Sequence, residues 1–535
     1  VLQPDVYMVL PQTGDGSGKS EWYNFIMMDP VKITLPQGKV TIKIVSNGTF
    51  GNLDYMLFEK VTEDNSNQSA MFKANIKSMR ADGKILLSDV YNDPSLMDAF
   101  VAQLTNEQLV ELSGGKRAKI ATGTGTIGNL PEYEIPAAQT ADGPAGLRLA
   151  SPCTAWPVAT LLACTWDTDL VEQIGVAIGK EAKLNNVDIW LAPGMNLHRD
   201  PLCGRNFEYF SEDPLITGKM AAAITKGVQS EGVAVTLKHY AANNKERNRN
   251  SSDSRVSERA LREIYLKGFE IAIKEANPWC IMSSYNYLNG VETSNSYDLL
   301  TAIPRGEWGF EGFIMTDWGN NSQHALEVIA GNDVKMPSGN AQNVLNGIKG
   351  GLVKREQLER NIKNVLNVLM KTPAFQKVLN PIVHNISANE ISRIKAVDYV
   401  WATNDIGAEL CNDADGGFNP TYTNAGQWLL YKVNVEKAGI YKFYPRIACN
   451  NAGAAFEIYV DDELVGSFTQ TTATGGWQNW ITGQPVEIQL PSGEHDLKIA
   501  ITQNGMNVNW FEFQLVEEII EEKPFVIEPV ELDRT

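Results

Sequence analysis

Three short hydrophobic runs, each followed at once by polar residues, form the clearest pattern in the chain. The runs are residues 233–237, 279–282 and 312–316. Each has the length of a β-strand buried on both faces, and a helical pattern separates the first two. Lys238 and His239 follow the first run, and Asp317 follows the third. Polar residues at the ends of successive parallel strands predict the active-site face of a (β/α) barrel.

The pattern continues on both sides of these runs and predicts a (β/α)8-type TIM barrel over residues 96–375. Ser257 is a good N-cap for the helix that separates the first two runs. Residues 188–193 form a further hydrophobic run, and the apolar spacing over residues 97–112 predicts one amphipathic helix that opens the domain. Helical patterns then close the domain at residues 325–330 and 340–370.

Both ends of the chain show β patterns, and one end repeats the other. Residues 31–44 alternate between hydrophobic and polar around a Pro-Gln-Gly turn. At a constant offset of about 455 positions, many residues between Trp22 and Phe58 match identical residues near the other end of the chain; Trp22, for example, matches Trp477. The match predicts two copies of one β-sandwich module, a whole copy at residues 390–517 and the second half of a copy at residues 1–61.

The predicted fold is therefore α/β plus all-β, a TIM barrel flanked by β-sandwich modules. A polar stretch predicts a linker at residues 62–95, and an acidic, Pro-containing stretch predicts a tail at residues 518–535. A half module would leave a sheet edge and a core uncovered. Because the sequence also begins at Val1 and not at Met, we expect either a missing upstream part or other strands that complete the half module.

Composition narrows the partners that such a chain can bind. The 535 residues carry a formal net charge of −18 and no run of Lys and Arg, which argues against nucleic acid and an anionic membrane surface. A neutral ligand such as a sugar suits this charge. No hydrophobic stretch approaches the length of a membrane span. The six cysteines and five histidines show no metal-ligand spacing, so we expect no catalytic metal and no cofactor.

Four motifs in the barrel region resemble the signature of glycoside hydrolase family 3. They are KHYAANN, SERALRE, MSSYN and TDW, at residues 238–244, 257–263, 282–286 and 316–318. The similarity keeps its order and spacing over roughly residues 95–375, about half of the chain. Members of the family are mostly retaining exo-β-glycosidases, and the resemblance implies that Asp317 is the nucleophile that forms a glycosyl-enzyme. Retention also takes a carboxylic acid about 5–5.5 Å from the nucleophile.

The resemblance also implies a set of substrate-binding residues near Asp317. The matching positions are Asp142, Arg148, Arg205, Lys238, His239, Met282, Tyr285 and Trp318. Carboxylate, guanidinium and amine groups suit sugar hydroxyls, and an indole suits the apolar face of a sugar. Structural explanations stay open, such as a helix N-cap for Asp317, an ion pair for Arg205 and core packing for Met282. We interpret Glu208 and Glu246 as structural residues that hold arginines or backbone.

The chain departs from the family at the acid/base residue. Two-domain members carry this glutamate on a second α/β layer domain, and nothing in the chain resembles one. Single-domain members use an Asp-x-His pair, but the corresponding loop at residues 252–255 reads Ser-Asp-Ser-Arg. Some relatives are circularly permuted, with the layer domain ahead of the barrel, which fits the removal of an upstream part. The acid/base residue stays unassigned, and a missing α/β domain or a partner chain is its expected source.

The motifs IKAVDY, GQW, GGW and NVNW stand in the C-terminal β region, at residues 394–399, 426–428, 475–477 and 507–510. They resemble landmarks of a family 6 carbohydrate-binding module, an antiparallel β-sandwich. The resemblance implies that Tyr422 and Trp477 stack on a sugar and that Asn507 hydrogen-bonds it. The structural alternative is that Trp477 packs a loop and Asn507 caps a turn. Lys395 stands where the family has a glutamate that helps to bind structural calcium, which argues against calcium.

The resemblances imply a retaining exo-β-glycosidase, with β-glucosidase preferred, that acts on a β-linked oligosaccharide or glucoside. The alternative is a catalytically crippled barrel that binds or scaffolds sugars, or one that takes its acid/base from a missing domain or a partner chain. Sugar-binding modules favour a secreted or cell-surface location without deciding it. The sugar, the linkage and the oligomeric state stay open.

Overall fold

The computed structural model describes residues 83–117, 123–149, 152–403, 406–421, 423–503 and 505–519. All of them belong to the second of two units of the chain, Phe72–Thr535, and the first unit is Val1–Met71. The predicted half module at residues 1–61, most of the predicted linker and tail, and Tyr422 lie outside the described residues. The interpretations of these segments therefore stay predictions.

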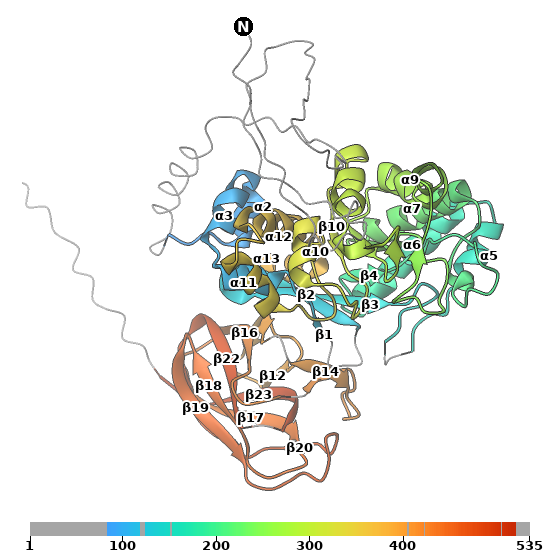
Figure 1. Cartoon of the computed structure of the whole chain (residues 1–535). Helices are drawn as coiled ribbons and strands as arrows, with labels where there is room; N and C mark the ends of the chain where they lie inside the picture. The colour runs from blue at the N-terminus through green and yellow to red at the C-terminus, as the bar shows by residue number, and fades with distance from the viewer. Residues whose placement is uncertain are drawn as a thin grey trace, which may run out of the picture. The chain divides into compact units, whose positions relative to one another are not determined.

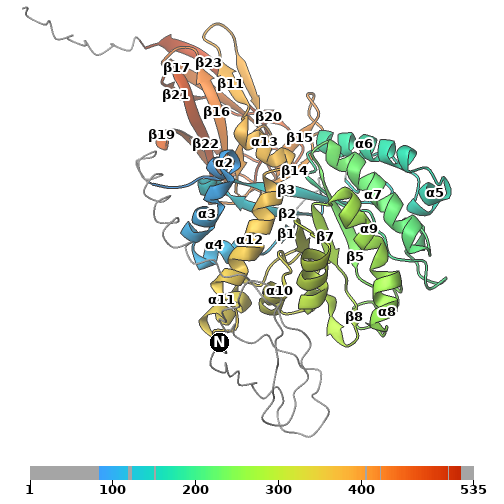
Figure 2. The same ribbon diagram turned by 90° about the horizontal axis from the view of Figure 1, so that it is seen from above.

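A seven-stranded sheet in the order β1-β2-β3-β4-β5-β7-β10 forms the centre of the first described domain (Figure 1, Figure 2). Its strands are β1 (Lys116–Arg117), β2 (Gly125–Leu130), β3 (Ile135–Asp142), β4 (Ile189–Leu191), β5 (Ala234–Tyr240), β7 (Cys280–Ser283) and β10 (Phe313–Met315). The four predicted hydrophobic runs form β4, β5, β7 and β10, as expected. From β3 to β10 all neighbours are parallel, so their carboxyl ends lie along one edge of the sheet.

The other end of the sheet departs from the eight parallel strands that were predicted. β1, β2 and β3 pair in the antiparallel direction. Only residues 131–134 connect β2 to β3, and a connection this short can join only antiparallel neighbours. Isolated bridges from Met315 to Val334 and from Gly114 to Lys335 carry the hydrogen bonding from β10 back towards β1. A mixed α/β domain with a curled sheet is therefore confirmed, whereas a regular eightfold barrel is not.

Hydrophobic cores on both faces explain why the parallel strands are apolar throughout. Cys280 and Met282 belong to a core shared with α4 and α12, whereas Ile281 belongs to a core under α7 and α9. Helices α6, α7 and α9 lie side by side along the sheet (Figure 2). The longer helices are α4 (Asn106–Leu112), α6 (Thr168–Leu184), α7 (Pro214–Ser230), α9 (Lys267–Ala276), η6 (Asp298–Glu307), α10 (His324–Ala330), α11 (Ala341–Lys349), α12 (Arg355–Leu369) and α13 (Pro373–Leu379).

Shorter elements connect these helices and extend the domain at its N-terminal side. Leu87 and Val90 of α2 belong to the hydrophobic core, so the folded domain begins ahead of the boundary predicted at residue 96. The shorter elements are α2 (Leu87–Asn92), η1 (Pro94–Leu96), α3 (Met97–Gln103), η2 (Pro131–Tyr133), α5 (Ala159–Cys164), η3 (Asn206–Glu208), β6 (Asp253–Ser254), α8 (Glu258–Ala260), η4 (Leu261–Tyr265), β8 (Tyr287–Leu288), β9 (Val291–Glu292) and η5 (Thr293–Asn295).

The single helix predicted over residues 97–112 is wrong, because a capping box divides it into α3 and α4. Thr105 has an extended backbone, and its Oγ1 accepts a hydrogen bond from the Gln108 N–H at 3.2 Å. The Gln108 side chain accepts in return from the Thr105 N–H at 2.9 Å. These bonds satisfy amides that would otherwise lack partners at a helix start. The predicted N-cap at Ser257 is confirmed, since its hydroxyl accepts from the Ala260 N–H.

Two sheets around one hydrophobic core form the C-terminal domain, which confirms a β-rich module in this region. One sheet has the order β11-β16-β22-β18-β19 and the other β12-β23-β17-β20, while β13 and β21 pair at β16 and β17. All neighbours except β11 and β16 are antiparallel. The strands are β11 (Val383–Ile386), β12 (Ser392–Lys395), β13 (Trp401–Ala402), β14 (Gly407–Leu410), β15 (Phe418–Thr421), β16 (Trp428–Val435), β17 (Gly439–Ala448), β18 (Ala454–Val460), β19 (Glu463–Gln470), β20 (Ile481–Thr482), β21 (Val486–Leu490), β22 (Gly493–Gln503) and β23 (Asn507–Glu518).

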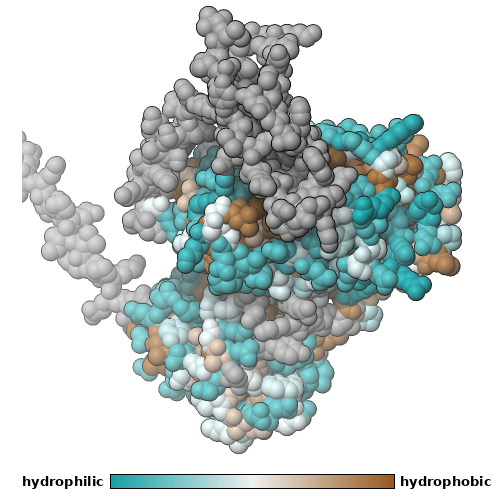
Figure 3. Space-filling view, in the orientation of Figure 1, coloured by the Kyte–Doolittle hydropathy of each residue, from teal (hydrophilic) through white to brown (hydrophobic). Residues whose placement is uncertain are grey.

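The face of the molecule seen in Figure 3 is mainly hydrophilic, and its hydrophobic side chains stand in small separate groups. In the part of the chain that the structure describes, no helix combines the length and the hydrophobicity that crossing a membrane requires. None of the six cysteines forms a disulfide bond.

Candidate active site

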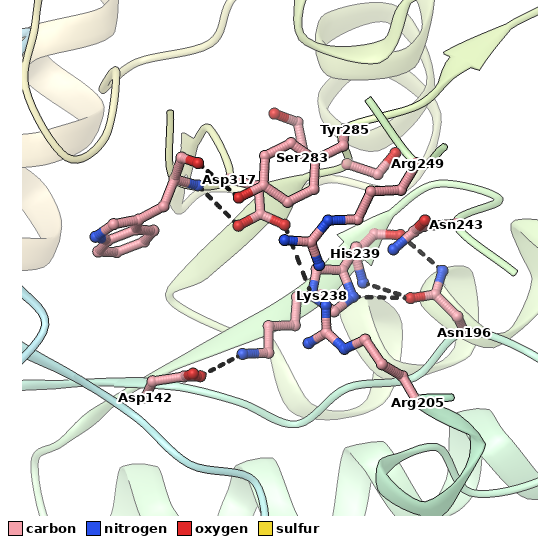
Figure 4. A network of polar contacts seen from close by, with 12 residues as sticks. Asp142, Asn196, Arg205, Lys238, His239, Asn243, Arg249, Ser283, Tyr285 and Asp317 are labelled. Carbon is pink, nitrogen blue, oxygen red and sulfur yellow. Dashed lines mark hydrogen bonds and ion pairs between the residues drawn. The ribbon is translucent and has the colours of Figure 1, made fainter. Parts of the chain in front are cut away.

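Side chains from the ends of the parallel strands meet at one edge of the sheet (Figure 4). β3 ends at Asp142, and Lys238 and His239 lie near the end of β5. Tyr285 follows β7, and Asp317 follows β10. Because these strands run in the same direction in one sheet, their ends bring residues that are far apart in sequence to one place. The structure therefore assembles the cluster that the strand pattern predicted.

Asp317 is 8% exposed, and its two carboxylate oxygens have different surroundings. Oδ1 accepts a hydrogen bond from the Trp318 N–H at 2.7 Å. Oδ2 is buried without a hydrogen-bond partner and lies 3.8 Å from Nε2 of His239. Buried polar atoms are usually paired, and the exceptions are typical of functional sites. The alternative role as a helix N-cap is wrong, because the next helix, α10, begins only after Gln323.

Burial and nearby cations act in opposite directions on this carboxyl group. Burial raises the pKa of Asp317, whereas Lys238, the Trp318 N–H, Arg205 and Arg249 lower it. The net effect is a pKa above the ordinary value. Without the three cations, burial alone would favour the neutral form still more strongly.

Lys238 and Asp142 form an ion pair at the same edge of the sheet. Nζ of Lys238 lies 2.6 Å from Oδ1 of Asp142, and Arg148 donates to Oδ2 at 3.0 Å. Burial raises the pKa of Asp142, but the charge and hydrogen bond of Lys238, aided by Arg148, more than offset this effect. The pKa of Asp142 therefore lies below its ordinary value. Arg148 is largely exposed, whereas Lys238 is almost completely buried.

His239 is held by Asn196, which lies in the loop after β4. The His239 N–H donates to Oδ1 of Asn196, and the Asn196 amide nitrogen Nδ2 donates to the His239 carbonyl, both at 2.8 Å. The ring atom Nδ1 lies 3.0 Å from the same Oδ1 and 3.4 Å from the Tyr209 hydroxyl. Burial lowers the pKa of His239 well below its ordinary value, and Arg205 and Lys238 lower it further. The imidazole is therefore neutral at neutral pH.

Two arginines approach the site, and a glutamate holds each of them. Arg205 pairs with the buried Glu208, and Arg249 pairs with Glu246 at 2.9 Å. The Arg249 guanidinium also lies over the ring of Tyr285, 4.5 Å from the ring centroid. The expectation that Glu208 and Glu246 hold arginines is confirmed by these contacts.

Tyr285 and Trp318 lie next to Asp317, whereas Met282 points into a core. The Tyr285 hydroxyl donates to the Trp318 carbonyl at 2.6 Å, and the Trp318 indole donates to the Thr124 carbonyl at 3.3 Å. Burial and the Asp317 charge raise the pKa of Tyr285, so its hydroxyl remains a donor. Met282 is 2% exposed inside a hydrophobic core, which fits the packing alternative. A sugar contact for Met282 stays a prediction.

Three residues of this cluster were not identified from the sequence: Asn196, Tyr209 and Arg249. Asn196 follows a buried strand, which is the same signal that identified Lys238 and Asp317, so the pattern could have revealed it. Arg249 lies in the loop after the KHYAANN motif, where only the tertiary fold shows that it faces Tyr285.

The family model for the glycosyl hydrolase family 3 N-terminal domain matches residues 101–371, which is half of the chain. The chain belongs to glycosyl hydrolase family 3. This membership confirms the family that the four motifs in the barrel region indicated.

Known proteins similar to the family 3 chain include several β-glucosidases. β-Glucosidase A of Butyrivibrio fibrisolvens is 52% identical over 268 residues, which cover 49% of this chain and 32% of that protein. A β-glucosidase of Ruminococcus albus is 39% identical over 380 residues, which cover 65% and 40%. The structure of β-glucosidase 3B from Thermotoga neapolitana with glucose is 43% identical, has a TM-score of 0.51 and covers 53% of this chain and 43% of that one. The family 3 chain thus spans less than half the length of these relatives.

A second family model, the carbohydrate-binding module of family 6, matches residues 395–515 of the family 3 chain. Asn507 is buried there, and its amide nitrogen donates to Glu409 and to the Trp477 carbonyl, both at 2.6 Å, while Oδ1 has no partner. Trp477 is 42% exposed. The structure therefore brings Asn507 and Trp477 together, whereas Tyr422 is not described. The two family matches together imply a carbohydrate ligand.

The direct contacts of Asp317 do not identify an acid/base residue. Among the residues that the structure describes, no hydrogen bond or ion pair joins Asp317 to another carboxyl group. Among the same residues, no group of three or more His, Cys, Asp and Glu side chains could hold a metal ion.

Proposed function

We propose that the chain is a retaining exo-β-glycosidase, or the barrel part of one, with a terminal β-glucoside as the preferred substrate. One observation carries this proposal: Asp317, which the resemblance aligns with the family's nucleophile, keeps a buried Oδ2 without a hydrogen-bond partner. The hydrogen-bonding groups around it suit the hydroxyls of a neutral sugar. The nearby cations favour the ionised form of the carboxylate nucleophile.

In this mechanism Oδ2 of Asp317 attacks the anomeric carbon of the sugar and displaces the leaving oxygen. A glycosyl-enzyme forms, and water hydrolyses it from the face that the leaving oxygen has vacated. Oδ1 is occupied by the Trp318 N–H, which leaves Oδ2 as the attacking atom. Arg205 and Lys238 favour the ionised carboxylate that the first step consumes. The Tyr285 hydroxyl lies close to the same carboxyl group.

The remaining residues of the cluster are proposed to bind the terminal sugar. Asp142 is kept ionised by Lys238, so it can accept hydrogen bonds from two sugar hydroxyls. Lys238 and Arg205 supply donors, and Arg148 lies at the exposed rim. Trp318 offers an apolar surface to the sugar ring. These roles rest on the geometry of the cluster together with the family's pattern.

Removing the Lys238 charge tests this binding role. We expect Lys238→Met to lower kcat/KM for an aryl β-glucoside roughly 10- to 100-fold, because a charged hydrogen bond to substrate is lost. Asp142→Asn should have a similar effect, and the double variant should lose less than the product of the two. The matched control is Lys219→Met, which removes a lysine from an exposed pair with Glu275. Equal activities of the Lys238 and Lys219 variants would refute the binding role.

We propose that Trp477 and Asn507, together with Tyr422, bind a sugar in the family 6 module. Trp477→Ala should weaken retention on soluble β-glucans in affinity electrophoresis at least about tenfold, because an aromatic ring stacked on the sugar is lost. Leu464→Ala is the control, since Leu464 is an exposed apolar residue on β19. Unchanged retention of the Trp477 variant would assign that tryptophan to loop packing instead.

A second function is favoured by one observation, that the sequence shows neither the second α/β layer domain nor the Asp-x-His pair that supplies the family's acid/base. A barrel without an acid would bind sugars but hydrolyse natural glycosides poorly, unless a missing α/β domain or a partner chain supplied the acid. The two proposals share the binding site and differ in the efficiency of leaving-group departure.

Trapping of the glycosyl-enzyme tests the main proposal directly. A 2-deoxy-2-fluoro β-glucoside with a dinitrophenyl leaving group should label the chain once, because it reacts with the nucleophile and then hydrolyses slowly. Peptide mass spectrometry should place the label on Asp317, and Asp317→Asn should abolish it. A label on another carboxyl group would exclude Asp317 as the nucleophile. Binding of glucosides without any label would favour the second function.

A further inference from the structure

Asn196, which has no role in the proposed function, makes three contacts with His239 beside the proposed site (Figure 4). It lies in the loop after β4, is 3% exposed and reaches across to β5. Its side chain contacts the backbone N–H, the backbone carbonyl and the ring atom Nδ1 of His239. No other side chain in the described residues makes such a set of contacts with His239.

The two backbone contacts determine which way the Asn196 amide points. Nδ2 lies 2.8 Å from the His239 carbonyl, and Oδ1 lies 2.8 Å from the His239 N–H. If the amide were reversed, two donors would face each other and two acceptors would face each other. Oδ1 is therefore the atom that lies 3.0 Å from Nδ1 of the ring.

An acceptor 3.0 Å from Nδ1 implies that Nδ1 carries a hydrogen. The Tyr209 hydroxyl is the competing partner, at the longer distance of 3.4 Å. A hydrogen bond from Tyr209 to a bare Nδ1 would leave Nδ1 and the Asn196 oxygen as two acceptors in contact. The shorter contact therefore decides between the two tautomers.

The charges around His239 favour a ring that carries only this one hydrogen. Arg205, Lys238 and Arg249 face it as cations, Asp317 faces it as the one carboxylate in contact, and Tyr209 packs edge-on against it. Nε2 then has a lone pair and lies 3.8 Å from Oδ2 of Asp317, which has no donor either. An O–H group that enters beside these two acceptors can donate its hydrogen to one of them.

We infer that Asn196 is a positioning residue that holds His239 with its hydrogen on Nδ1, so that Nε2 accepts a hydrogen bond from a substrate hydroxyl beside Asp317. The tautomer follows from the geometry alone. The identity of the hydroxyl as one of a bound sugar rests on the proposed function. His239 thus serves as an acceptor at the site, while Lys238 and Arg205 are the donors.

The tautomer can be read from long-range proton–nitrogen NMR spectra of the full chain labelled with nitrogen-15 histidine. Only five histidines contribute signals, and His239→Gln identifies the one of interest. We expect a protonated Nδ1 and a bare Nε2 in the wild type. Asn196→Ala should shift the population towards a protonated Nε2. A protonated Nε2 in the wild type, or an unchanged tautomer in Asn196→Ala, would overturn the inference.

Asn196→Asp keeps the size of the side chain and the acceptor that faces Nδ1, whereas the donor to the His239 carbonyl is lost. The added negative charge should raise the pKa of His239 and protonate both ring nitrogens. Because the inferred role needs a bare Nε2, kcat/KM for a dinitrophenyl β-glucoside should fall at acidic pH. It should recover as pH rises through the raised pKa of His239. The wild type should lack this additional acid limb, and a variant profile with the wild-type shape would count against the role.

Asn361→Ala is the matched control for a structural loss. Asn361 is fully buried and donates to the Val328 and Asn332 carbonyls, away from the site. We expect Asn196→Ala to lower kcat/KM roughly 10- to 100-fold, and Asn361→Ala to change it less than about threefold per folded molecule. Equal losses of kcat/KM in the two variants would show that Asn196 has only a structural role. If the NMR result holds in a chain that neither binds nor hydrolyses glucosides, the proposed function fails and the tautomer stands.

Discussion

Replacing Asp317 with alanine should abolish hydrolysis of a dinitrophenyl β-glucoside, with a loss of kcat of at least about a thousandfold. The variant loses the carboxylate that forms the glycosyl-enzyme, and no other group of the described cluster can take its place. Azide should restore part of the activity, because a small anion can enter the space of the deleted carboxylate and attack the anomeric carbon. The rescued product should be a glycosyl azide of inverted configuration.

The fold should survive this substitution, since Oδ2 of Asp317 has no partner to lose. Asp333→Ala provides the contrast, because that buried carboxylate pairs with Arg305 at 2.6 Å and accepts from the Ile314 N–H at 2.7 Å. Breaking such a pair should cost about 3 kcal/mol of unfolding free energy. Asp333→Ala should therefore lose more thermal stability than Asp317→Ala, whereas Asp317→Ala should lose more activity than Asp333→Ala. An Asp317→Ala variant with a tenth of wild-type turnover would end the assignment.

The second expected result concerns the leaving group. Because the sequence shows neither of the family's two acid/base arrangements, the chain by itself should hydrolyse activated aryl glucosides much faster than cellobiose. A general acid contributes about 10²- to 10⁴-fold when the leaving group is a poor one. We expect at least this difference in kcat/KM between dinitrophenyl β-glucoside and cellobiose. A series of aryl glucosides should show a steep dependence on the pKa of the leaving phenol.

The pH dependence gives an independent check of the same arrangement. Asp317 must be ionised to attack, and burial raises its pKa above the ordinary value. Activity should therefore be present at neutral pH and fall as pH decreases through a value above 3.8. No basic limb from an acid group should follow at higher pH. Efficient hydrolysis of cellobiose by the pure chain would contradict this result and move the search to Glu246, Glu208 and the loops of the β module.

Local pattern was sufficient for the strands that carry the site. Each of the runs that became β5, β7 and β10 is buried on both faces, so its hydrophobicity shows in the sequence without knowledge of its neighbours. Local pattern failed where a short-range contact competes with periodicity. The apolar spacing of residues 97–112 predicts one helix, but the capping box at Thr105 divides it.

The sequence pattern also did not show the direction in which each strand runs. β2 and β3 have the composition of strands, but only the connection at residues 131–134 and the resulting hydrogen bonds make them antiparallel. The (β/α)8-type barrel was predicted from the hydrophobic runs that form β4, β5, β7 and β10, whereas β1, β2 and β3 pair in the antiparallel direction.

By itself, the sequence determined the family, the α/β and β-rich regions and the strand-end residues, since motifs and hydrophobic runs are properties of neighbouring positions. Only the tertiary structure decided which atoms meet. The structure leaves Oδ2 of Asp317 without a partner. It also joins Lys238 to Asp142 and Asn196 to His239, which lie on different strands or loops. Their distances depend on how the sheet curls and how strands align, and no spacing along the chain encodes those quantities.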